Sequence, residues 1–213
     1  MKRNNSLRML AIMALVCLVF GLGRLAAAGE WKVEVVSGDR SIVLTGADAA
    51  AMKAHTVNAA FLRSTGRIDG PSAYTVIPMD TILAQVGGIN PEQAIRVTAR
   101  DGYQMVYSFA QVNGGVFTYD DKGNTLRVGG PSMLLAFESE RDSADKLPRI
   151  IYGRPDGVVI TDGHFWAKSV AKIEVIKGVE DWQISLSGSE KVWLDRATFE
   201  SIVTCPVTPH PAV

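Results

Sequence analysis

Apolar and polar residues alternate with a period of two in the segment WKVEVVSG, residues 31–38. Val33 and Val35 fall on one face of an extended chain, and Lys32 and Glu34 fall on the other. One apolar face and one polar face are typical of a β-strand that covers a core. The pattern therefore predicts that the folded part of the chain begins with a half-buried strand.

Two short stretches change to a helical pattern. Thr45 or Asp48 can cap the first helix, which continues to Lys53, because their oxygens accept hydrogen bonds from the free amides of a first turn. The second helix begins within IPMD, residues 77–80, and carries apolar residues at helical spacing. The glycines at 87–88 end it, since glycine enters the left-handed conformation at little steric cost. Both helices are predicted to be short.

Most of the remaining chain is predicted to be strand, in short apolar segments separated by polar turns that indicate hairpins. The segments read SIVLTG, TVNAAFLRS, AIRVTA, QMVYSF, GVFTY, TLRVG, PSMLLAF, RIIYG, GVVIT and SVAKIEVI. Between them, Gly70 and Pro71 are predicted to break the chain, and the charged residues of 138–145 are predicted to form a solvated loop. Two or three short helices among about ten strands predict a β-rich α+β domain with a mixed sheet.

The end of the chain repeats the pattern of its first strand. WQISLSG, residues 182–188, matches WKVEVVSG, and LDRATFESI after it repeats a short strand that leads to a helix capped near Asp195. Two amphipathic strands can also match by chance. The predicted organisation is therefore residues 1–28, a domain of residues 29–178, and a strand–helix extension of residues 179–213 that resembles the start of a second copy.

Residues 1–28 have the order of charge and hydropathy that defines a secretory signal peptide. MKRNNSLR is basic and polar, residues 9–23 are almost continuously apolar, and the alanines at 26–28 are small residues suited to cleavage. An apolar run of about fifteen residues is shorter than the roughly twenty that a membrane-spanning helix needs. The sequence thus predicts export to a periplasm or the cell exterior, without a stable membrane span after processing. A retained anchor is the alternative.

The charge of the chain bears on its partners. The full chain carries 22 basic and 22 acidic residues. Every charged residue of the leader is basic, so processing leaves a net charge of about −4. Binding to nucleic acid requires a basic surface that neutralises phosphates. Nucleic acid is therefore not an expected partner.

The end of the chain contains two candidate metal ligands. Cys205 is the single cysteine left after processing, which excludes an intramolecular disulfide. In TCPVTPHP, Cys205 and His210 offer ligands that suit zinc or copper, with His55 and His164 as further candidates. Two ligands do not complete a site, and a free thiol is the alternative.

Four segments occur in an order that is typical of one family of domains. They are AAFLRSTG, YTVIPMDTILAQVGG, VTARDGYQMVYSF, and the pair GGPSMLLAF with WAKSVAKIEV. Together they resemble the molybdopterin-binding domain of the sulfite oxidase type of oxidoreductase, over residues 31–176. The resemblance implies a β-rich fold of that type, molybdopterin as the cofactor and an oxidoreductase activity.

Three positions that carry the chemistry of that family differ in this chain. The family holds molybdenum by a cysteine thiolate, and Arg63, or at best Ser64, stands at that position here, neither of which supplies a thiolate. Met133 stands where the family has an arginine for anionic cofactor oxygens. Of a pair of lysines in the last strand, Lys168 is present, whereas Ala171 replaces the second and Lys172 lies one place out of register.

We therefore expect an exported protein of this fold that acts as a binding or accessory module and holds no molybdenum. Its candidate cofactor-binding residues are Arg63 and Lys168. The first alternative is a molybdopterin-dependent oxidoreductase in which these two residues meet the phosphate of the cofactor. The second is a metal-binding protein that uses Cys205 and His210. The expected partner is a small-molecule ligand or a redox partner protein.

Overall fold

The computed structural model describes residues 31–178, 183–187 and 191–195 of the 213-residue chain. The predicted leader, the helix expected after Asp195, and the candidate ligands Cys205 and His210 lie outside these residues. The described part is β-rich, with two mixed sheets and a few short helices. This confirms the α+β class predicted from the sequence.

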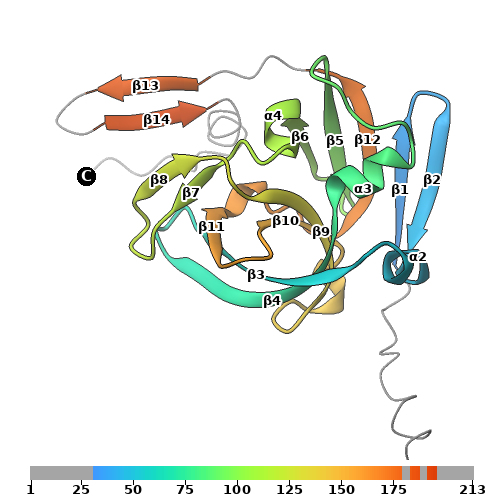
Figure 1. Ribbon diagram of the computed structural model, residues 1–213, viewed down its shortest axis with the longest axis horizontal. Coiled ribbons are helices and arrows are strands. Elements are labelled where there is room, and N and C mark those ends of the chain that lie inside the picture. The colour runs from blue at the N-terminus through green and yellow to red at the C-terminus, as the bar shows by residue number, and fades with distance from the viewer. Residues whose placement is uncertain (1–30, 179–182, 188–190, 196–213) are drawn as a thin grey trace, which may run out of the picture. The chain divides into compact units, whose positions relative to one another are not determined.

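One mixed sheet joins the two ends of the domain (Figure 1). Its strands, in spatial order, are β2 (Arg40–Thr45), β1 (Lys32–Ser37), β12 (Val170–Lys177), β5 (Gln93–Ala99) and β6 (Gln104–Ser108). β1 and β12 run parallel, with Glu34 level with Lys172, and the other neighbours are antiparallel. Because β12 lies in the centre, the sheet is complete only when the end of the domain has been added.

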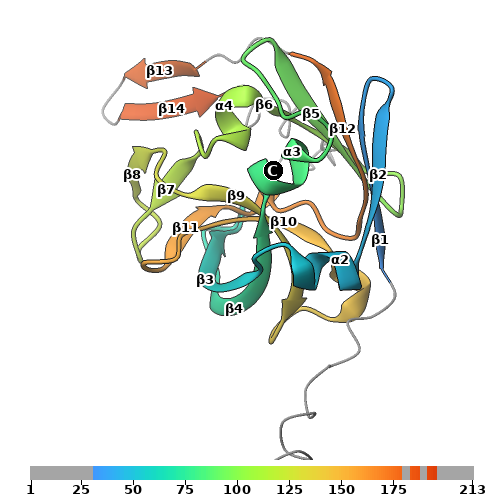
Figure 2. The same cartoon turned by 45° about the vertical axis from the view of Figure 1, so that its right-hand side comes forward.

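The second mixed sheet is larger and bends beside the first (Figure 2). Its strands, in spatial order, are β10 (Arg149–Gly153), β9 (Ser132–Ser139), β4 (Ile68–Pro78), β3 (His55–Leu62), β11 (Val159–Asp162), β7 (Phe117–Tyr119) and β8 (Thr125–Val128). β3 and β11 are the parallel pair. Near the end of the chain, β13 (Gln183–Ser187) and β14 (Lys191–Asp195) form an antiparallel hairpin, as β1 and β2 do.

The two large sheets share one hydrophobic core. β1 alternates as predicted, since Val33 and Val35 are fully buried while Lys32 and Glu34 face solvent. Core residues without exposed surface come from both sheets: Val33, Val35, Ile95, Ile173, Val76, Ile77, Leu135, Ile150 and Ile151. Apolar burial contributes about 25 cal/mol per Å². The shared core therefore holds the two sheets against each other.

The helices are short, and local side chains cap two of them, α2 (Gly46–Ala51) and α4 (Phe109–Val112). The others are α3 (Met79–Ala84) and the 3-10 turns η1 (Ala144–Lys146) and η2 (Gly163–Phe165). At α2 both predicted caps act together: the Asp48 carboxylate accepts from the Thr45 amide at 2.9 Å, and the Thr45 hydroxyl accepts from the Asp48 amide. Gly87 and Gly88, both with positive φ, follow α3 as predicted.

Two predictions about secondary structure are wrong. β4 runs through Gly70 and Pro71, where a break was expected, because its ladder with β3 shifts register between Ala59 and Phe61 and leaves the proline unpaired. QMVYSF is not strand to its end. Ser108 opens α4 through a capping box with Gln111, which turns the chain out of β6.

Candidate functional site

The carboxylate of Asp69 lies among three arginines at the turn between β3 and β4. Its side chain is 3% exposed. Arg67 donates to Oδ1 from Nε at 3.0 Å and from Nη2 at 2.8 Å. Arg141 places Nη2 2.9 Å from Oδ2, and Arg63 donates to that same oxygen. One carboxylate thus holds three guanidinium groups together at the end of a strand.

The arginines set the protonation state of Asp69. Burial by itself raises the pKa of the carboxyl group, but hydrogen bonds from Arg67, Arg63 and Arg141 outweigh burial and lower the pKa to about 2. Asp69 therefore stays ionised at neutral pH and fixes the positions of its partners.

The ring of Phe61 lies close to three of the arginine side chains. The guanidinium carbons of Arg63, Arg141 and Arg149 lie 6.0, 5.5 and 5.7 Å from the centroid of the Phe61 ring. These distances lie close to the upper limit of about 6 Å for a cation–π interaction. Phe61 packs in turn on Trp166, with ring centroids 4.9 Å apart. The aromatic pair gives the guanidinium groups a common apolar surface.

A second carboxylate holds Arg149 inside the protein. The side chains of Arg149 and Asp142 are 2% and 6% exposed and form an ion pair. Arg149 also donates from Nη2 to the Trp166 carbonyl at 3.4 Å, and its guanidinium lies 5.1 Å from the Trp166 ring. Removing one partner of such a pair leaves a buried charge without compensation. The pair therefore fixes the segment after β9 against β10.

Lys168, between η2 and β12, adds a fifth cation. Burial lowers the pKa of its ammonium group most, and the charges of Arg149, Lys146 and Arg63 lower the pKa further, against an opposite effect of Asp142. Lys168 therefore lies within electrostatic range of Arg149 and Arg63.

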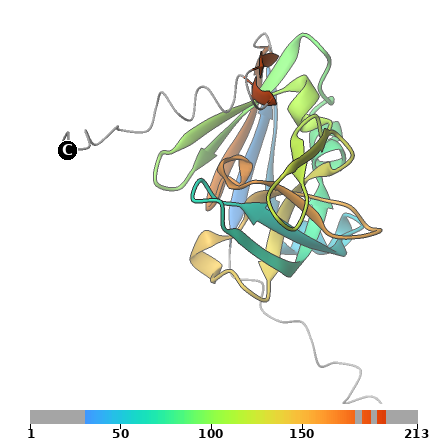
Figure 3. The same cartoon turned by 90° about the vertical axis from the view of Figure 1, so that its left-hand side faces the viewer.

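We call these residues the basic cluster. Its members are Arg63, Arg67, Arg141, Arg149 and Lys168, with the carboxylates Asp69 and Asp142. Five cations and two carboxylates leave a net charge of about +3. In Figure 3 the turn between β3 and β4 (teal) and the loop that carries η1 (gold) lie on the same side of the two sheets. The cluster thus joins segments that are distant in sequence.

The two predicted cofactor-binding residues, Arg63 and Lys168, lie within electrostatic range of each other, since the charge of Arg63 lowers the pKa of Lys168. The structure places the other positions of the resemblance elsewhere. Met133 is 2% exposed and belongs to the core in β9. The Lys172 ammonium lies in the first sheet, 3.9 Å from a carboxylate oxygen of Glu34 and 3.6 Å from one of Glu174.

The sequence did not indicate the remaining members of the cluster. The prediction of a solvated loop at residues 138–145 is wrong for Asp142, which is buried against Arg149, and for Arg141, which binds Asp69. The sequence of a mixed-charge segment is the same whether its side chains are solvated or form ion pairs with distant residues. One available signal was an arginine, Arg149, at the start of the otherwise apolar strand RIIYG.

The further candidate metal ligands, His55 and His164, lie toward opposite ends of β3. His55 begins β3, and His164 follows Asp162, which is level with Leu62 at the other end. A strand of this length separates them by about 20 Å, so they cannot bind one ion. Among the described residues, no group of three or more His, Cys, Asp or Glu side chains is arranged to hold a metal ion.

No protein-family model matches the chain, and no curated protein matches it either. Within the part of the chain that the structure describes, none of the helices has the length and apolar character needed to cross a membrane. The residues of the basic cluster and their chemistry are therefore the features of the protein that bear on its function.

Proposed function

We propose that this protein is an exported binding module with a molybdopterin-binding type of fold, which holds a phosphate-bearing small molecule at the basic cluster and no molybdenum. The observation that carries the proposal is the excess of cations over carboxylates at one place. An anion is the ligand that such an excess attracts.

The donors of the cluster face outward while its central carboxylate faces inward. The side chains of Arg63, Arg67 and Arg141 are 47%, 68% and 32% exposed, whereas Asp69 is 3% exposed. A guanidinium group has five N–H donors, and the two oxygens of Asp69 cannot use those of three arginines. The donors left over form planar forks that match phosphate oxygens bidentately.

Lys168 supports the same class of ligand. Its ammonium group is partly desolvated, and the charges of Arg149 and Arg63 repel it. A bound phosphate would relieve this repulsion and receive hydrogen bonds from Lys168. An arginine fork with a lysine point charge is a common way to bind phosphate.

The residues of the cluster do not fit molybdenum. The position at which the resemblance implies a cysteine thiolate is occupied by Arg63, whose guanidinium is bound to Asp69, and Ser64 follows it. Neither side chain supplies the soft sulfur ligand that the family uses. The site therefore has no thiolate to hold a redox-active molybdenum ion.

Molybdenum content and anion binding test this proposal together. The protein is purified natively from its exported fraction, analysed by mass spectrometry for molybdenum, zinc and copper, and titrated with inorganic pyrophosphate by calorimetry. We expect no molybdenum and one pyrophosphate site. Arg63→Gln and Lys168→Gln should each weaken pyrophosphate about tenfold, since each removes a charge-assisted hydrogen bond.

The matched control is Arg96→Gln, because Arg96 is 39% exposed and pairs with Glu174 in the other sheet. It should leave pyrophosphate binding unchanged. About one molybdenum atom per chain and a fluorescent pterin released on denaturation would instead support the oxidoreductase. Zinc or copper that is lost in Cys205→Ser would support the metal-binding alternative.

A further inference from the structure

A second cationic site flanks the other end of β9. The basic cluster includes residues just after β9, whereas this pocket is lined by residues just before it, so about 25 Å of strand separates them. The pocket has a volume of about 320 Å³. Its lining consists of Thr118, Tyr119, Leu126, Arg127, Gly129, Gly130, Pro131, Arg154, Val158, Val159 and Ile160. We call it the Gly–Gly–Pro pocket.

Close contacts with the backbone hold the glycine–proline segment of the pocket lining in place. A Cβ on Gly114 would lie 1.8 Å from the carbonyl oxygen of Pro131, so only glycine lets the turn after α4 approach this segment. Gly130 has φ +104°, and a Cβ there would lie 2.9 Å from Nη2 of Arg127. The bare backbone of Gly130 thus allows the Arg127 guanidinium to lie across it.

Two arginines of the pocket have few acidic partners. Arg127 forms no ion pair with any described residue, although its backbone carbonyl accepts from Thr118 at 3.1 Å. The Nε atom of Arg154 lies 3.3 Å from Oδ1 of Asp156, whose side chain is 78% exposed. That same buried Nε has no hydrogen-bond partner among the described residues. Of the two guanidinium groups, only that of Arg154 has a carboxylate partner among the described residues, and that carboxylate is largely solvated.

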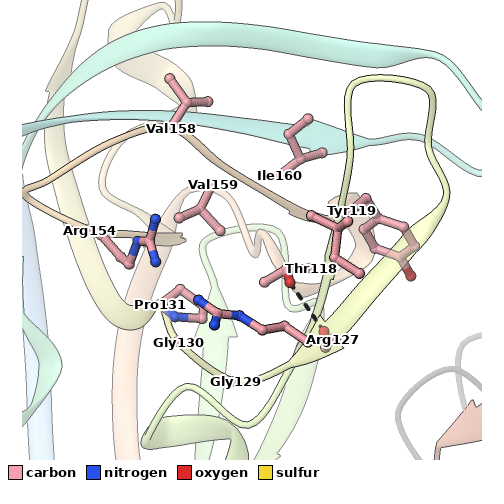
Figure 4. A pocket seen from close by; sticks show the side chains of 11 residues that line it. Thr118, Tyr119, Arg127, Gly129, Gly130, Pro131, Arg154, Val158, Val159 and Ile160 are labelled. Carbon is pink, nitrogen blue, oxygen red and sulfur yellow. Dashed lines mark hydrogen bonds between the residues drawn. The ribbon is translucent and has the colours of Figure 1, made fainter.

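The rest of the lining is apolar and open to solvent. Leu126 and Val158 are 63% and 48% exposed, which places two of the large exposed apolar side chains of the described chain at one pocket. In Figure 4 Val158 and Ile160 lie across the pocket from Arg127, and Val159 lies between them and Pro131. An apolar wall that faces a cationic wall fits a ligand with both properties.

We infer that the Gly–Gly–Pro pocket binds a small organic anion with an apolar body, a carboxylate on a short hydrocarbon chain. Arg127 and Arg154 receive the carboxylate, because guanidinium forks match its two oxygens. Leu126 and Val158 cover the hydrocarbon part, which removes apolar surface of both partners from water. This site does not depend on the function proposed for the basic cluster.

Titration with octanoate, below the concentration at which it forms micelles, tests the inference. We expect one octanoate per chain by calorimetry, and shifts of the Gly129 and Gly130 amide signals in NMR spectra. Acetate, which lacks the apolar chain, and 1-octanol, which lacks the charge, should each bind at least about tenfold more weakly. Arg127→Gln and Arg154→Gln should each weaken octanoate about tenfold.

Two further variants separate this site from the basic cluster. Val158→Asn should weaken octanoate several-fold without removing a charge, whereas Arg63→Gln and Arg96→Gln should leave octanoate binding unchanged. Absence of octanoate binding would overturn the inference. So would wild-type affinity in Arg127→Gln and Arg154→Gln with unchanged melting temperatures, or loss of binding in Arg63→Gln instead.

Discussion

The basic cluster and the Gly–Gly–Pro pocket both present arginines, but they differ in what holds those arginines in place. In the cluster, buried Asp69 and Asp142 bind the guanidinium groups. In the pocket, Arg127 lies across bare glycine backbone, and the partner of Arg154 is mostly solvated. An arginine that binds a buried carboxylate contributes to the fold and offers a ligand only its remaining N–H donors, whereas an arginine without such a partner offers a ligand all of them.

The largest expected effect concerns the buried pair of the cluster. Asp142→Ala should lower the free energy of unfolding by about 4 kcal/mol, because it leaves the charge of Arg149 buried without a partner. Denaturant-induced unfolding measures this change. Asp156→Ala, which removes the carboxylate beside Arg154, should cost less than about 1 kcal/mol because Asp156 is exposed. Equal costs would mean that the two sites do not differ as described.

The next effect concerns the close approach of Gly114 to Pro131, which lines the pocket. Gly114→Ala should lower the free energy of unfolding by about 3 kcal/mol, since Gly114 has φ +84° and its new Cβ would clash with Pro131. Gly102→Ala is the matched control, because Gly102 has φ +87° but nothing within 4 Å of the added atom. It should cost only about 1 kcal/mol. Similar melting temperatures for the two variants would contradict the close contact.

The third effect links the cluster to pH. Asp69→Asn should destabilise the protein by about 2 kcal/mol at pH 7, because three arginines lose a charged acceptor. The folded pKa of Asp69, about 2, lies below the value of 3.8 for a free side chain. The stability that Asp69 contributes is therefore complete above about pH 4 and is lost as pH falls toward 2. Urea unfolding from pH 2 to 7 should show the wild type and the variant converge, and a constant difference would refute the assignment.

The smallest expected effect is the difference in stability between variants of a pocket arginine, Arg127, and a cluster arginine, Arg141. Arg127→Gln should change the free energy of unfolding by less than about 0.5 kcal/mol, since no described residue pairs with it. Arg141→Gln should cost about 1 kcal/mol because it loses a hydrogen bond to Asp69. Thermal and urea unfolding of both variants measure the difference. A larger cost for Arg127→Gln would indicate that the pocket arginine is structural.

Part of the candidate site could be predicted from sequence. The resemblance pointed to Arg63 and Lys168, and the charge of Arg63 acts on Lys168 in the folded protein, while their role in binding stays a prediction. Asp69, Arg141 and Asp142 could not be predicted, since nothing near them in sequence shows which charged residues become buried. The Gly–Gly–Pro pocket could not be predicted either. Its two arginines are separated by twenty-six residues of chain, and only folding brings them to the lining of one pocket.

Features that depend on neighbours within a few residues could be predicted from sequence. These include the two faces of β1, the caps Thr45 and Asp48 of α2, and the glycine stop after α3. Contacts between distant segments were needed to show that β12 lies in the centre of the first sheet, that β4 continues through Pro71, and that Asp142 is buried against Arg149. Strand order and burial depend on contacts between distant segments, and a local pattern of residues does not contain them.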